Sequence, residues 1–91
     1  MHMKAIVSVI GKDQIGIIAS VCNVLQAQQV NVLDISQTVL QDYFVMIALT
    51  DISACPLPIA ELSVLLQESG KDKGLEVRIQ REDIFNAMHR I

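Results

Sequence analysis

The spacing of apolar residues divides the first half of the chain into three predicted elements. Residues 4–10 form a β-branched run that stops at Gly11, which predicts a central strand covered on both faces. Residues 16–28 repeat apolar positions at the i, i+1, i+4, i+7 spacing of one helical face, so they predict a helix that ends near Gln28 and Gln29. Residues 31–41 alternate apolar and polar positions, which predicts a half-buried strand.

The second half of the chain continues the pattern. Residues 43–50 are apolar on both faces and predict a strand that forms a hairpin with the preceding one through Gln41 and Asp42. A helix is predicted from Ile59, behind a proline-containing loop, to about Ser69. Residues 75–80 alternate as an edge strand with one wet face, and residues 82–91 predict a short helix with its apolar residues on one side: Ile84, Phe85, Met88 and Ile91.

This order of elements, βαββαβ, predicts an α+β ferredoxin-like sandwich. In that fold two helices cover one face of a four-stranded antiparallel sheet. We therefore expect a single domain over residues 1–91, with a core over residues 4–80 and an added C-terminal helix over residues 82–91. The other sheet face is expected to carry apolar residues of the first and third strands, and to be covered by the tail or by a partner.

Composition points to self-association and against two classes of partner. The chain has 91 residues of which 52% are apolar, and so small a domain has difficulty burying them, so we expect a homodimer or a higher homo-oligomer. The net charge is −3 and the basic residues are scattered, which argues against nucleic-acid binding. The apolar runs are far shorter than the roughly 20 residues that span a bilayer, so we expect no membrane insertion and a cytoplasmic protein. Either Met1 or Met3 can be the natural start.

The residues that enzymes and metal sites need are missing or badly spaced. Cys22 and Cys55 form no CxxC pair, and His2 and His89 lie near the termini without a third ligand at useful spacing, so no metal or cofactor is expected. No Ser-His-Asp or Cys-His set can be assembled, which argues against an enzyme. Gly11 and Gly16 have the spacing of a phosphate-binding loop, but the lysine and hydroxyl positions of that motif hold isoleucines.

The loop between the first strand and the first helix is the best candidate for a binding site. Gly11 and Gly16 permit backbone geometry or close approach that a Cβ would hinder. A helix that begins near Gly16 offers free N–H groups to a carboxylate or a phosphate. Asp13 either caps this helix or accepts a hydrogen bond from a ligand ammonium group. Both uses suit an amino-acid ligand.

The segments 9–18, 30–32 and 34–37 together resemble the ACT domain, a βαββαβ module that senses amino acids. The resemblance covers residues 4–80 and is strongest to small stand-alone ACT proteins related to the repressor of the glycine cleavage system. It implies a ligand between the loop of one protomer and the second strand of its partner. The implied site residues are Gly11, Asp13, Ile15, Gly16 and Ile17 on the loop side and Asn31 and Val32 on the other. The family often has Arg-Pro where this chain has Gln14-Ile15.

These observations lead to two functional hypotheses. The favoured one is a non-enzymatic regulatory module that binds an amino acid or a similar small metabolite at a dimer interface and signals to another protein. The alternative is a protein-protein interaction subunit without a small-molecule ligand, which docks through its apolar sheet face and tail. Asn31 has a second interpretation as well, as a turn residue that adopts left-handed geometry between helix and strand.

Overall fold

The structure, a computed structural model of the chain, describes residues 3–12, 16–71 and 73–82. It confirms the predicted βαββαβ order, and the predicted ends of the elements are displaced by two residues at most. The elements are β1 (Lys4–Lys12), α1 (Ile17–Ala27), β2 (Asn31–Leu40), β3 (Tyr43–Asp51), α2 (Ile59–Lys71) and β4 (Glu76–Arg81). The predicted helix over residues 82–91 lies outside the described residues, apart from Glu82.

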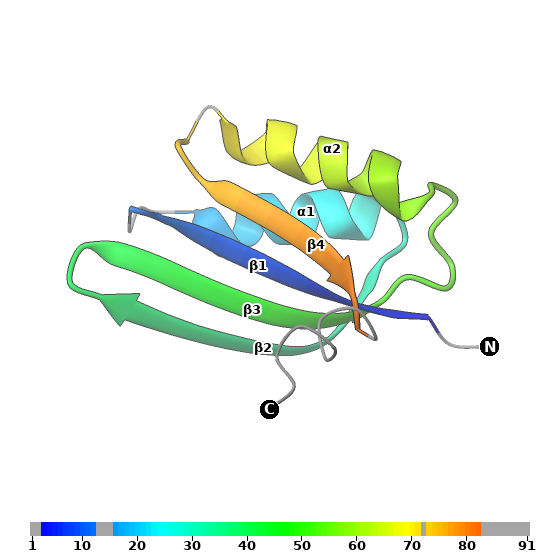
Figure 1. Ribbon diagram of the computed structural model, residues 1–91, viewed down its shortest axis with the longest axis horizontal. Coiled ribbons are helices and arrows are strands. Elements are labelled where there is room, and N and C mark those ends of the chain that lie inside the picture. The colour runs from blue at the N-terminus through cyan, green and yellow to red at the C-terminus, as the bar shows by residue number, and fades with distance from the viewer. Residues whose placement is uncertain (1–2, 13–15, 72, 83–91) are drawn as a thin grey trace.

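The four strands form one antiparallel sheet in the order β2-β3-β1-β4, so β2 and β4 are its edges (Figure 1). The edge position predicted for the fourth strand is confirmed. Two crossovers, β1-α1-β2 and β3-α2-β4, connect parallel strands, and right-handed crossovers put both helices on the same face. In Figure 1 α2 runs beside β4, α1 lies behind the sheet, and no helix crosses β2.

The core lies between the helices and the inner face of the sheet. Alternate residues of the central strands enter it, and Thr50 is its one buried polar residue in the described part of the chain. The Thr50 hydroxyl donates a hydrogen bond to the carbonyl oxygen of Ala5 at 2.9 Å, so its burial leaves no polar group unpaired. The side chains that the helices bury against the sheet are Ile17, Val21 and Leu25 of α1 and Leu62 and Leu66 of α2.

The prediction that β1 is covered on both faces is wrong for the described chain. Ala5, Val7 and Val9 are fully buried, but Ile10, on the other face, is 46% exposed. The cause is the crossover geometry, which leaves the face opposite the helices uncovered. The related prediction, that this second face carries apolar residues of the first and third strands, is confirmed by Ile10 and by Ile47, which is 43% exposed.

The prediction of a half-buried β2 is also wrong. Nine of its ten residues are exposed, and only Val32 is partly buried against the core. The alternation of residues along β2 identifies two different faces, but it does not reveal whether anything covers them. The register with β3 shifts between Val32 and Asp34, so the strand carries a bulge near its start.

Both helices end in the same left-handed motif. After α1, Gln29 has a φ of 61° and Val30 N–H donates to Leu25 O at 2.9 Å. After α2, Gly74 has a φ of 68°, and Leu75 N–H donates to the carbonyl of the last turn. The left-handed residue at the helix-to-strand connection is therefore Gln29, and the interpretation of Asn31 as that residue is wrong.

The β2-β3 hairpin is confirmed and its turn can now be described. Leu40 pairs with Tyr43, so the loop has two residues. Only the first of them, Gln41, has a positive φ, of 55°, which is the pattern of a type II′ turn. A glycine normally takes this position, and this turn has none, so its type could not be predicted from its residues.

Candidate functional site

The candidate loop leaves β1 at Lys12 and enters α1 through Gly16; Asp13 and Ile15 lie outside the described residues. Gly16 is the N-cap of α1 and has a φ of 87°, which an L-residue adopts only under strain. A Cβ built on it would meet no atom within 4 Å. Glycine is required here by the backbone, and the space beside it is open.

Gly11 serves a different purpose. A Cβ at this buried position would lie 2.5 Å from Leu75 Cδ2 and 3.3 Å from Leu75 Cα. The absence of a side chain therefore lets the residue that precedes β4 pack against the end of β1. Gly11 holds the sheet together near the loop, which is a packing role.

The start of α1 has the electrostatics of an anion site. Its first N–H groups have no partner within the helix, and the described residues provide neither a capping side chain nor an acidic group in its first turn. Lys73 Nζ also hydrogen-bonds Ser20 Oγ, which places a cation near this turn. Ile17 is only 2% exposed, so its side chain belongs to the core and only its backbone N–H can face a ligand.

The other predicted half of the site, Asn31 and Val32, lies at the opposite end of the sheet. One cross-strand row contains Lys12, Tyr43 and Leu40, and the row at the far end contains Lys4, Asp51 and Asn31. Nine residue steps along β2 correspond to about 30 Å. Within one chain the two halves of the predicted site therefore do not meet.

The strand that begins with Asn31 is an incomplete edge. No described strand pairs with its outer side, and large apolar side chains project from both of its faces. Leu33 is 45% exposed, Ile35 37%, Val39 53% and Leu40 61%. Such a long apolar edge normally pairs with another strand.

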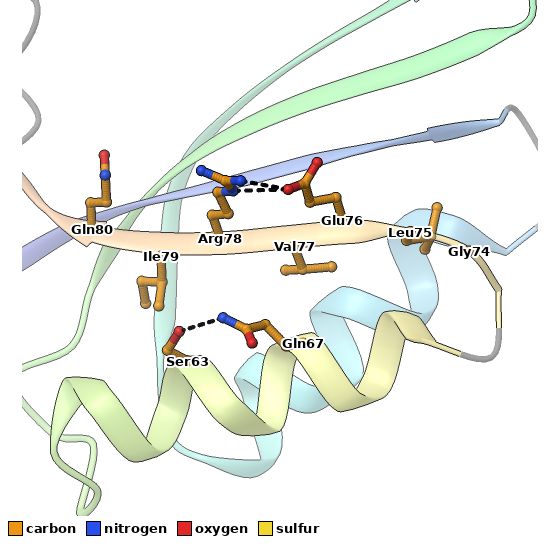
Figure 2. A pocket seen from close by; sticks show the side chains of 9 residues that line it. All are labelled: Ser63, Gln67, Gly74, Leu75, Glu76, Val77, Arg78, Ile79 and Gln80. Atoms are coloured by element: carbon orange, nitrogen blue, oxygen red, sulfur yellow. Dashed lines mark hydrogen bonds and ion pairs between the residues drawn. The ribbon is translucent and has the colours of Figure 1, made fainter.

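A second feature, which the sequence did not reveal, is a groove of about 570 Å³ along the outer edge of β4. Figure 2 shows Val77 and Ile79 pointing toward α2, where Gln67 Nε2 donates to Ser63 Oγ at 3.2 Å. Glu76 and Arg78 point away from α2 and form an ion pair of 2.6 Å. The i, i+4 spacing of Ser63 and Gln67 indicates that both lie on one side of a helix, but it does not indicate that this side faces β4. The charged side chains that line the groove, Glu76 and Arg78, are paired with each other, so the groove offers few charged groups to a ligand.

The described residues contain no cluster of three His, Cys, Asp or Glu side chains that could hold a metal ion. Cys22 and Cys55 are free thiols, each partly buried. None of the helices in the described part of the chain has the length and apolarity needed to cross a membrane.

Comparisons with known proteins agree with this architecture. A family model described as ACT domain matches residues 4–80. A UPF0237 protein of Clostridium acetobutylicum is 49% identical over 89 residues, which are 98% of this chain and all of the relative. A UPF0237 protein of Methanocaldococcus jannaschii is 46% identical over 88 residues, 97% of this chain and 98% of the relative.

Solved structures extend the comparison. An ACT domain protein from Streptococcus pneumoniae superposes with a TM-score of 0.83 at 37% identity, over 98% of this chain and all of the other. A protein described as a glycine cleavage system transcriptional repressor has a TM-score of 0.77 at 20% identity over 89% of this chain and 46% of its own, a likeness of fold alone. By its family match, its close relatives and its fold, this chain belongs to the ACT domain family.

Proposed function

We propose that this protein is a non-enzymatic regulatory module that binds an amino acid or a similar small metabolite between two copies of the chain. ACT domains in general are regulatory modules that bind small molecules. The observation that carries the proposal is the placement of the two site halves at opposite ends of β2, together with the unpaired outer edge of that strand.

Two copies that pair through their β2 edges would complete the site. In a two-fold antiparallel pairing centred on the strand, the partner's Asn31 lies opposite Leu40. Leu40 shares a cross-strand row with Lys12, the last residue before the candidate loop. The pairing therefore puts Lys12 and the Asn31 of the other copy in the same row, three strand spacings or about 14 Å apart, a gap that the loop and a bound ligand would span. This arrangement occurs twice in the dimer.

The groups that would meet there suit a zwitterion. The free N–H groups at the start of α1 fit a carboxylate, and the open space at Gly16 allows its approach. Asp13 and the partner's Asn31 supply oxygen acceptors for an ammonium group, and the Asn31 amide also supplies a donor. Ile15 and Val32 would contact the ligand side chain. With Gln14-Ile15 in place of the family's frequent Arg-Pro, this loop lacks a rigid proline and a positive charge, so its ligand contacts differ from those of family members that have Arg-Pro.

A ligand bound between two protomers changes their association by its differential affinity for the paired state. In this proposal the response is passed to another protein. We also place the protein in the cytoplasm, where free thiols such as Cys22 and Cys55 remain reduced.

The first experiment is thermal unfolding against a panel of free amino acids at millimolar concentration. A ligand at one hundred times its Kd stabilises the folded state by about 2.7 kcal/mol, which raises the Tm of so small a domain by roughly 10 °C or more. An Asp13→Ala variant should fold and lose the shift, whereas an exposed substitution remote from the loop, Val64→Ala, should keep it. No shift with any amino acid would favour the second candidate, a ligand-free interaction subunit. The exposed apolar residues on the sheet face opposite the helices support that candidate, because a protein partner could bind there.

A further inference from the structure

The sheet face opposite the helices is an apolar stripe two strands wide. It is formed by alternate residues of the central strands β1 and β3, and none of the described elements covers it. Cross-strand rows place Ile6 beside Leu49 and Ile10 beside Val45, and in the row between them Ile47 lies beside the small polar Ser8. Ile10 and Ile47 are 46% and 43% exposed. We call the five apolar residues of these rows the open-face stripe.

Polar residues border the open-face stripe on both sides. Along β4 the border is the Glu76–Arg78 ion pair and Gln80, which Figure 2 shows on the side away from α2. Along β2 the residues in the same rows are Asp34, Ser36 and Thr38. A polar border around an apolar centre is typical of a surface that another segment covers.

The chain leaves β4 at the margin of this stripe. Gln80 shares a cross-strand row with Ile6 and Leu49, and Arg81 pairs with Ala5. Residues 83–91 follow, outside the described part of the chain. As a helix, nine residues are about 13 Å long. This is close to the roughly 14 Å that separate four neighbouring strands, so such a helix can cross the stripe from β4 to β2.

The sequence of this tail matches the stripe. Ile84, Phe85, Met88 and Ile91 fall on one side of a helix, and Asn86 falls opposite them. Glu82 and Asp83 stand at its start, where negative charge is favourable. The tail therefore offers an apolar surface of the right length at the place where the open-face stripe begins.

We propose that residues 83–91 form a short helix that lies across the open-face stripe of their own chain. Tethering favours this occupant over a second copy, because a segment attached at the margin of the stripe has an effective concentration of about millimolar or more. The tail then closes the one apolar face that the helices leave open. It restricts association to the β2 edge and prevents the sheets of different dimers from stacking.

Disulfide trapping in the full-length chain tests the contact. With Cys22→Ser and Cys55→Ser as background, one variant carries Ile6→Cys with Ile84→Cys and another Leu49→Cys with Met88→Cys. A disulfide needs Cα atoms closer than about 7 Å, so at least one pair should oxidise within a single chain. The control pair, Val64→Cys with Met88→Cys, should stay reduced, because Val64 is on α2 and 53% exposed.

Non-reducing gels and mass measurement separate the outcomes. Intrachain disulfides in a test pair, with none in the control, support the proposal. Disulfides only between chains would overturn it in favour of a second copy on the stripe, and oxidation no greater than in the control would overturn it in favour of an uncovered face.

A second measurement uses single substitutions in the full-length chain. Phe85→Asp should detach the tail, raise the fluorescence of a bound hydrophobic dye several-fold and produce assemblies larger than the parent. Asn86→Asp, on the opposite side of the predicted helix, should change neither. Equal behaviour of the two variants would contradict the proposal.

Discussion

The two edges of the sheet differ in length, cover and charge. β4 has six residues; its inner side chains Val77 and Ile79 are buried under α2, and its outer ones include the Glu76–Arg78 ion pair. β2 has ten residues and exposes apolar side chains on both faces. Short, charged edges are a common protection against unwanted pairing, whereas a long apolar edge invites it. The β4 edge is therefore protected against pairing with another strand, whereas the β2 edge is suited to it.

The largest effect is expected from a charge on β2. Val39→Lys should weaken self-association at least about 100-fold, or about 2.7 kcal/mol, because each pairing would bury the new charge twice. Folding should persist, since Val39 is 53% exposed in the single chain. Val64→Lys on α2 is a matched control, because its valine is equally exposed at 53%. Sedimentation equilibrium measures both, and equal association of the two variants would remove β2 from the interface.

The next effect concerns the packing that attaches β4. Gly11→Ala should destabilise the fold by about 1–3 kcal/mol, because its Cβ would force Leu75 away from β1. Gly16→Ala has no clash to relieve and should cost about 1 kcal/mol through its left-handed φ alone. Urea unfolding of the two variants gives the difference. A larger cost at Gly16 would show that the loop, rather than the β4 junction, is the more constrained place.

The connection into β2 can be made more stable. Gln29→Gly should raise stability by about 0.5–1 kcal/mol, because glycine adopts the observed φ of 61° without steric cost. Gln28→Gly, one residue earlier, should lower stability, since Gln28 has a φ of −98° that any residue adopts. Thermal unfolding compares the pair. Stabilisation by both, or by neither, would contradict the left-handed cap.

The smallest effect is expected at the β4 edge. Arg78→Gln should change the free energy of unfolding by less than about 1 kcal/mol, because both side chains of the ion pair are well exposed, at 68% and 59%. The association constant should not change either. A marked loss of dimer in this variant would mean that β4 contributes to assembly and that the contrast between the two edges is incorrect.

The sequence was sufficient for the order of elements because local periodicity and turn residues agree with the final fold. It failed where the answer depends on contacts distant in sequence. Ile10 and Val39 have the same strand-like neighbours as buried residues, and only the positions of both helices leave them exposed. The left-handed residue after α1 depends on where the helix stops, so the sequence allows Asn31 as one interpretation, whereas the structure has Gln29 in that conformation.

The sequence supplies the candidate site as a set of proposed residues, but it does not supply their geometry. The sequence groups Gly11 with Gly16 as a loop residue. In the structure a side chain at Gly11 is excluded by Leu75, which precedes the neighbouring strand β4 and is distant in sequence. The family resemblance pairs the loop with the Asn31 of a partner, and the strand order and register add that the Asn31 of the same chain lies at the far end of the sheet. Periodicity cannot predict such a separation, because it follows from strand order.

The most direct test of a site shared between two chains is complementation between two variants. Asp13→Ala and Asn31→Ala should each abolish ligand binding in their own dimers. When equal amounts are unfolded and refolded together, half of the dimers are mixed, and each mixed dimer contains one intact site, so titration calorimetry should recover about a quarter of the parent binding sites. If the mixture binds no more ligand than the separate variants do, the site does not form between the two chains and the central claim is wrong.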